Sequence, residues 1–141
     1  MRTRLTVLAF STLSVTAPAM GQEREPLLLN EAHRQIVLAE MRGMLEGVQG
    51  IIGALSKADM ETVAKLSTEL GMGGPKPPME LRRRLPDEFR KIGFQVHTAF
   101  DELAASARAG EDTPRLLNRL QHALSGCTAC HCKFQITHAD Y

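Results

Sequence analysis

Near its carboxyl end the chain carries the run Cys127-Thr128-Ala129-Cys130-His131. Two cysteines separated by two residues and followed by histidine form the attachment signature of c-type haem. In that chemistry each thiol adds across one vinyl group of the haem, and the imidazole binds the iron as the proximal ligand. Positions i, i+3 and i+4 share one face of a helix, so all three side chains can face one flat cofactor. The run therefore predicts one covalent haem c, provided that the rest of the chain supplies an export route and a pocket.

An export signal is predicted over residues 1–21. Arg2 and Arg4 form a basic segment, and a short apolar segment and small residues at cleavage spacing follow it. The apolar segment is shorter than the ~20 residues that a membrane-spanning helix needs, which counts against a permanent anchor. We therefore expect a cleaved signal peptide, a periplasmic location and one mature domain over residues 22–141.

Charge and composition narrow the function further. The chain has 17 Lys and Arg against 16 Asp and Glu, and loss of Arg2 and Arg4 leaves 15 basic residues. With no basic excess to neutralise phosphates, a nucleic-acid partner is not expected. The absence of tryptophan makes a core filled by a large flat cofactor more credible. No Ser/His/Asp arrangement, phosphate-binding glycine loop or paired-carboxylate motif is evident, so we do not expect an enzyme.

Hydrophobic periodicity predicts four helices and no strand. The expected helices cover about residues 28–55, 60–70 and 86–109, and the last runs from residue 115 into the haem motif. Asn30 or a neighbour is the expected cap of the first helix, and Asp59 that of the second. Four glycines in the first helix would let another helix or a haem edge approach its backbone: Gly43, Gly47, Gly50 and Gly53.

Four helices with C-x-x-C-H on the last one resemble the class II c-type cytochromes, the cytochrome c prime group. The resemblance covers about residues 28–137. It implies an all-α fold, an up-down-up-down four-helix bundle with covalently bound haem c near the C-terminal end of helix four. It also makes a homodimer, often formed through helices one and two in this family, a candidate assembly.

The family has two kinds of iron site, which differ in the first helix. In one, an apolar residue covers an open sixth position; in the other, a methionine there is the sixth ligand. Arg34, Leu38 and Met41 resemble the first pattern, with Leu38 over the iron. Counting back from the end of the helix resembles the second pattern and puts the ligand close to Met41, with Met44 as the fallback. Met41 is the preferred candidate, although a methionine on an apolar face is otherwise a gap-filling core residue.

Aromatic residues are the candidates for packing against the haem, namely Phe94, Phe100 and Phe134. Phe134 keeps the aromatic that the family has three residues after the haem histidine, whereas Gln135 replaces its basic residue. That replacement mildly favours electron transfer over gas chemistry. His97 is a further candidate on the distal side, but a lone helical histidine more often makes a polar contact.

Three functions follow from these patterns. The first is one-electron transfer by a periplasmic cytochrome with redox partner proteins in the periplasm or at the membrane surface. The second is binding of a diatomic gas ligand, nitric oxide or carbon monoxide, at an open iron. The third, from another class, is a Cys/His zinc site or a redox disulfide between Cys127 and Cys130. Cys132 is left over, and we expect a partly exposed free thiol, with pairing between molecules as the alternative.

Overall fold

The computed structural model describes residues 23–138, so the signal peptide expected at residues 1–21 lies outside the described residues. Within the described part, five helices and two short strands follow one another. They are β1 (Glu25–Leu29), α1 (Glu31–Leu55), α2 (Met60–Leu70), α3 (Met79–Arg84), α4 (Asp87–Arg108), α5 (Thr113–Lys133) and β2 (Phe134–His138). The expectation of a mostly helical chain is confirmed, and the two strands are a departure from it.

Side chains start three of the long helices. Asn30, Asp59 and Asp112 cap α1, α2 and α5, and each side-chain oxygen accepts a hydrogen bond from the backbone N–H three residues later. These bonds satisfy one of the free N–H groups that every helix start exposes. The caps expected at Asn30 and Asp59 are therefore confirmed. After α4 the chain turns at Gly110, whose φ of 77° lies in the left-handed region that favours glycine.

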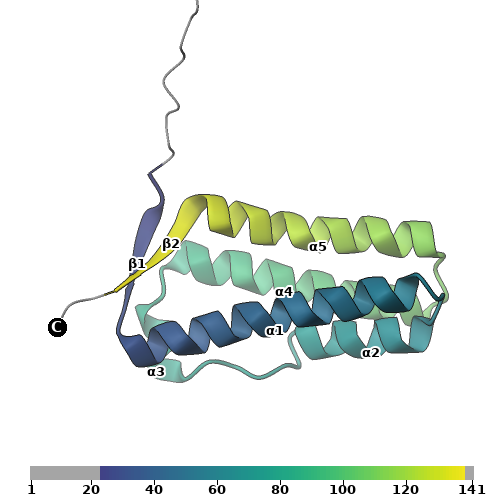
Figure 1. Cartoon of the computed structure of the whole chain (residues 1–141), viewed down its shortest axis with the longest axis horizontal. Helices are drawn as coiled ribbons and strands as arrows, with labels where there is room; N and C mark the ends of the chain where they lie inside the picture. The colour runs from purple at the N-terminus through teal and green to yellow at the C-terminus, as the bar shows by residue number, and fades with distance from the viewer. Residues whose placement is uncertain (1–22, 139–141) are drawn as a thin grey trace, which may run out of the picture.

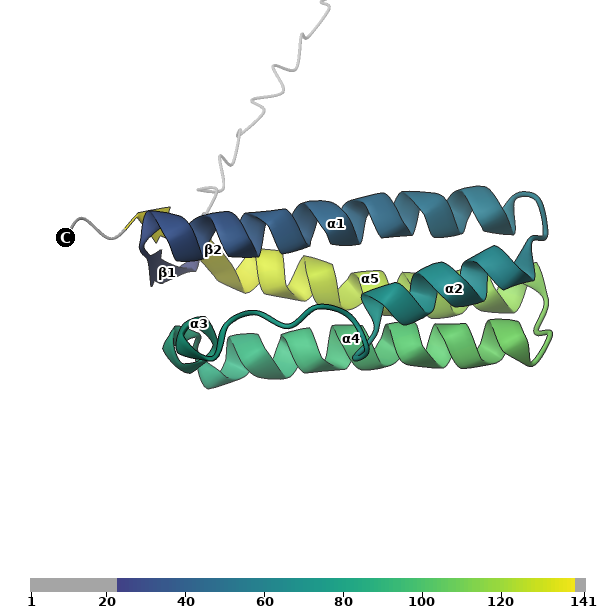
Figure 2. The same ribbon diagram turned by 90° about the horizontal axis from the view of Figure 1, so that it is seen from below.

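Four helices lie side by side, α1, α2, α4 and α5 (Figures 1 and 2). Along the chain, α1 packs on α2, α2 on α4 and α4 on α5. One apolar core runs between them, and these core side chains are fully buried: Ile51, Val63, Phe100, Leu103 and Leu116. Burial of each such side chain stabilises the fold by roughly 1.5–3 kcal/mol. Every one of the four helices contributes to that core.

The two strands pair in parallel at one end of the molecule, with Glu25 opposite Phe134 and Leu29 opposite His138 (Figure 1). Leu27 and Leu29 are buried, whereas Leu28 between them is 62% exposed. This alternation is that of a strand with one buried face. The first helix therefore begins at Glu31 rather than near residue 28, and the expectation of no strand was wrong. The sequence pattern did not reveal the strand because its pairing partner, β2, lies far away in the sequence.

A short helix, α3, was also missed because it follows a stretch rich in proline and glycine. Leu81 is fully buried and anchors it in a second apolar cluster, which is shared with the strands. The three arginines that follow are exposed, and Arg84 forms an ion pair of 3.5 Å with Glu80 one turn earlier. The arginine run is thus a solvated helix end.

Two of the four glycines of α1 lie where α2 approaches. A Cβ atom at Gly47 would lie 2.7 Å from Leu70 side-chain atoms, and one at Gly50 would lie 2.7 Å from Leu66. A Cβ atom at Gly43 or Gly53 would meet nothing within 4 Å. Glycine therefore allows the close approach of α2 at Gly47 and Gly50, whereas Gly43 and Gly53 face open space.

Alanine at these positions should have opposite effects on stability. Gly53→Ala should raise the free energy of unfolding by roughly 0.5–1 kcal/mol, because alanine favours the helix and meets no neighbour. Gly47→Ala should lower it by about 1 kcal/mol, because displacement of Leu70 outweighs the same helix gain. Denaturant unfolding of the two mature variants, followed by circular dichroism, measures both. An equal gain in both variants would contradict the close approach of α2.

Candidate haem site

The predicted haem motif lies in the last turns of α5, which ends at Lys133. Cys127 and Cys130 are half-buried, and His131 is exposed. All three side chains line one cavity of about 430 Å³, as their helical spacing predicts. Cys132 is also exposed but does not line this cavity. The structure thus brings together the three residues that the sequence singled out and leaves the fourth, Cys132, apart.

The cavity lies between α1, α4 and α5 and has a mostly apolar wall. Leu38, Met41 and Met44 contribute from α1, and Ile92, Val96 and Phe100 contribute from α4. Its volume falls within the range of about 300–1,000 Å³ that is common for sites of small molecules and cofactors. Such a wall suits the faces of a large apolar ring.

Helix packing explains why space is left here. α4 packs closely along α5, whereas α1 approaches α5 far less closely. Just before the motif, a Cβ atom at Gly126 would lie 2.6 Å from a methyl group of Val96, so glycine lets α4 and α5 meet at this point. α1 is held instead by α2, through Gly47 and Gly50. The gap between α1 and the α4–α5 pair is the cavity.

All three candidates for the distal side on α1 reach this cavity. Leu38 and Met41 are three residues apart and share a helix face, and Met44 follows one turn later. Each is half-buried. The structure therefore places a thioether sulfur and an apolar blocking group in the same wall, in the cavity that also contains the motif.

Of the three aromatic residues expected to pack against haem, one lines the cavity and two do not. Phe100 is fully buried and lines the cavity. Phe134 is buried in the second apolar cluster, where its ring meets that of Phe89 edge to face with centroids 5.5 Å apart. Phe94 is 58% exposed and does not line the cavity. At 100° per residue, Phe94 points about 200° away from the buried Val96, two positions later.

Phe89 also lines the cavity, although the sequence analysis did not single it out as an aromatic that packs against haem. It precedes Val96 by two helical turns, so the helical period already placed it on the inward stripe of α4. It belongs to the second apolar cluster and also reaches the cavity, so it joins the two.

Burial raises the pKa of the Cys127 and Cys130 thiols above its usual range, and at Cys130 the neighbouring Cys127 adds to the effect. Both are free cysteines. Cysteine pairs that work as redox disulfides have a lowered pKa instead, because the thiolate is the nucleophile. This direction is opposite to that of a redox-active pair.

A structural zinc site would need more ligands than the described residues bring together. Among the described residues, no three His, Cys, Asp or Glu side chains come together in a group that could hold a metal ion. Structural zinc takes four such ligands from the protein. A haem ring brings four nitrogen ligands of its own, so its iron needs only one or two axial ligands from the chain. The donor set of this cavity fits haem better than zinc.

His97 lines the cavity but has protein partners at both ring nitrogens. Its Nδ1–H donates a 2.6 Å hydrogen bond to the carbonyl oxygen of Leu70, and Nε2 lies 3.5 Å from a carboxylate oxygen of Glu40. The Glu40 carboxylate is the main cause that raises the pKa of His97, with the Leu70 carbonyl adding to it against desolvation. His97 thus joins α4 to α1 and α2, which is the polar contact expected of a lone helical histidine.

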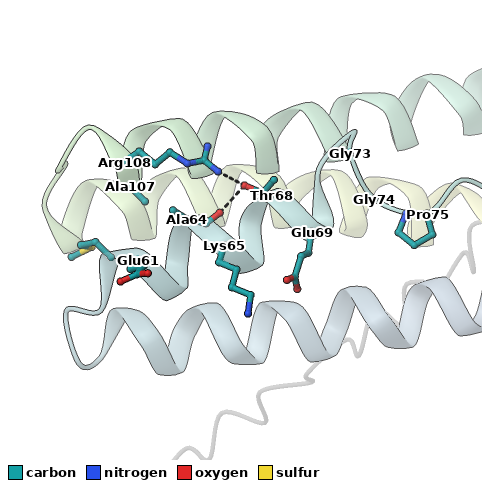
Figure 3. Close-up of a pocket in the computed structure, with 11 residues that line it drawn as sticks. Glu61, Ala64, Lys65, Thr68, Glu69, Gly73, Gly74, Pro75, Ala107 and Arg108 are labelled. Carbon is teal, nitrogen blue, oxygen red and sulfur yellow. Dashed lines mark hydrogen bonds between the residues drawn. The ribbon is translucent and has the colours of Figure 1, made fainter.

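A wider depression of about 830 Å³ lies between α2, residues 73–75 and the C-terminal end of α4 (Figure 3). Arg108 donates a hydrogen bond to the Thr68 hydroxyl, which in turn donates to the carbonyl oxygen of Ala64. Charged side chains of both signs line it, Glu61 and Glu69 against Lys65 and Arg108. None of the predicted site residues lies there.

Comparisons with protein-family models, with curated proteins and with solved structures find no match to this chain. Within the described residues, no helix combines the length and apolar character needed to cross a membrane. The features that bear on function are therefore the motif, the cavity and the helices that form it.

Proposed function

We propose that this chain is an exported c-type cytochrome that carries one haem c and transfers single electrons. The observation that carries the proposal is the shared cavity, with Cys127, Cys130 and His131 on α5 and Met41 on α1. Two thiols, an imidazole and a thioether are the donor set that covalent haem with His/Met ligation requires. The resemblance to class II c-type cytochromes implies the same set.

Each residue then has a distinct part. Cys127 and Cys130 would hold the haem through thioether links, and His131 and Met41 would be the iron ligands that the chain supplies. The haem, when bound, supplies the ferric/ferrous couple. The apolar wall, with Phe100 at its buried end, excludes water and so favours the less charged, reduced state. Methionine as the sixth ligand raises the reduction potential, which suits an electron carrier.

The topology of the four long helices also fits this class of cytochrome. The side-by-side arrangement of α1, α2, α4 and α5 (Figures 1 and 2) supports an up-down-up-down four-helix bundle with haem near the C-terminal end of its fourth long helix. The signal peptide over residues 1–21 would deliver a mature domain of residues 22–141 to the periplasm. Exposure of His131 supports a haem edge that periplasmic or membrane-surface redox partners can reach.

Gas binding at an open iron is the second candidate. Leu38 favours it, because this apolar side chain lines the cavity beside Met41 and matches the residue that covers the open position in cytochrome c prime. In that arrangement Met41 would only pack, and nitric oxide or carbon monoxide would be the ligand.

Visible spectra of the mature protein, produced with c-type haem maturation, test both candidates. We expect a low-spin spectrum in the reduced state that carbon monoxide does not change. A high-spin spectrum that shifts with carbon monoxide would replace electron transfer with gas binding. A colourless protein would contradict both and would favour a zinc site or a redox disulfide at the motif.

A further inference from the structure

Two smaller cavities lie beneath the loop of residues 71–78, on the side of α1 and α4 away from the motif. One, of about 410 Å³, lies between this loop, α1 and the end of α2. The other, of about 200 Å³, lies between the loop, α3 and the first half of α4. We call these the outer cavities, and the cavity that contains the haem motif the inner cavity.

Glu40 and His97 line all three cavities. Their ion pair therefore forms the partition between the outer cavities and the inner one. His97 is fixed from behind by its 2.6 Å hydrogen bond to the Leu70 carbonyl oxygen, and its Nε2 faces the Glu40 carboxylate at 3.5 Å. Both side chains keep about three-tenths of their surface exposed, at 27% and 30%. The partition thus contains two side chains that are both partly exposed to solvent.

Glycine leaves room on both sides of this partition. Gly43 lines the larger outer cavity, and Gly93 lines both the smaller outer cavity and the inner one. A Cβ atom at either position would meet nothing within 4 Å. Met44 and Phe89 complete the shared walls. A turn of the His97 ring would therefore thin the walls that the outer cavities share with the inner one.

We propose that the Glu40–His97 pair is a gate on the distal side, and that small uncharged molecules reach the inner cavity through it. The inference rests on the proposed haem function and adds to it the route by which external ligands approach the iron. The mostly apolar inner wall favours uncharged molecules, because an ion would lose much of its hydration there. In an electron carrier, the closed gate keeps such molecules from competing with Met41.

The rate of carbon monoxide binding to the reduced, haem-loaded protein tests the gate. Flash photolysis is carried out in the Met41→Ala background, which removes the preferred sixth ligand. Another protein ligand to the iron would slow carbon monoxide binding equally in every variant. The ratio of the rate constants of two variants therefore reports how fast carbon monoxide enters the inner cavity. Adding His97→Ala should raise the second-order rate constant about fivefold, because a partly exposed ion pair holds the closed state by about that factor. Glu40→Gln should raise it less, because the imidazole and its bond to Leu70 remain.

His122→Ala is the matched control, because this exposed histidine of α5 lines none of the three cavities. Its rate should equal that of the background. Rates for His97→Ala and Glu40→Gln that match this control would overturn the gate while leaving the haem assignment intact. No carbon monoxide binding in any variant would also overturn it. A missing haem spectrum in the unsubstituted protein would overturn the proposed function and the gate together. If His97→Ala does not incorporate haem, the rate constants of Glu40→Gln and His122→Ala are compared instead, and equal values overturn the gate.

Discussion

Serine in place of both Cys127 and Cys130 should abolish covalent attachment of haem. Both thiols line the inner cavity, and serine has a similar size there but cannot form a thioether. After co-expression with the c-type maturation system, the unsubstituted mature chain should have the mass of the polypeptide plus one haem. The double variant should have the polypeptide mass alone, and it should lose the haem stain on a denaturing gel.

The same double variant should also be far less stable. Without haem, the mostly apolar wall of the cavity of about 430 Å³ is left to water, and the packing that the ring would supply between α1 and the α4–α5 pair is lost. Loss of the packing of one large core side chain already costs about 2–5 kcal/mol, and a typical domain has about 5–15 kcal/mol of stability in all. We expect α1 to lose its position over the cavity, while α4 and α5 stay packed together. The backbone amides of α1 should therefore be the first to lose protection from hydrogen exchange.

Cys132→Ser supplies the control, because Cys132 is exposed and lies outside the cavity. It should keep the covalent haem and the stability of the unsubstituted protein. Loss of haem from Cys132→Ser, with retention in the double variant, would contradict the attachment site.

Met41→Ala should convert the reduced protein from a low-spin form into a high-spin form that binds carbon monoxide. Met41 lines the inner cavity from α1, and its sulfur is the preferred sixth ligand. Loss of that sulfur opens one coordination position of the iron. The reduction potential should fall by on the order of 100 mV, since axial ligands spread haem potentials over about 0.8 V. Spectra and a redox titration measure the two effects.

Leu38→Ala and Met44→Ala are matched comparisons on the same wall of α1. Both remove an apolar side chain of similar size, and neither should change the spin state. A spin-state change in Met44→Ala alone would move the ligand to Met44. An unsubstituted protein that is already high-spin, with a faster carbon monoxide reaction in Leu38→Ala, would show that Leu38 covers an open iron.

Patterns within short stretches of sequence were enough to predict the long helices and the shared helix face of the motif residues. The bounds of α2 and its cap at Asp59 were predictable because apolar spacing and capping chemistry lie within a few residues. The position of Cys127, Cys130 and His131 on one helix face followed in the same way from their spacing. The direction of Phe94 was open to the same reasoning, since Val96 and Phe100 define the inward face of α4.

Features that depend on distant contacts were not predictable from the sequence alone. Three consecutive leucines, Leu27 to Leu29, show no alternation in the sequence, and only pairing with β2 makes the middle one exposed. α3 depends on one buried residue, Leu81, in a cluster formed by other elements. The cavity itself depends on how far α1 stands from α5, which no single segment encodes.

The pairing of β1 with β2 has a consequence for the order in which this chain can fold. Gln135 donates a hydrogen bond to the Arg24 carbonyl oxygen across 111 residues of sequence, and the strands pair across a similar separation. Closing so long a loop is entropically costly and slow, whereas the helices form from local contacts. We therefore expect the strands to join last. Until they do, the C-terminal turn of α5 would not be held against the N-terminal segment, and the two cysteine thiols would stay accessible for the haem attachment proposed above.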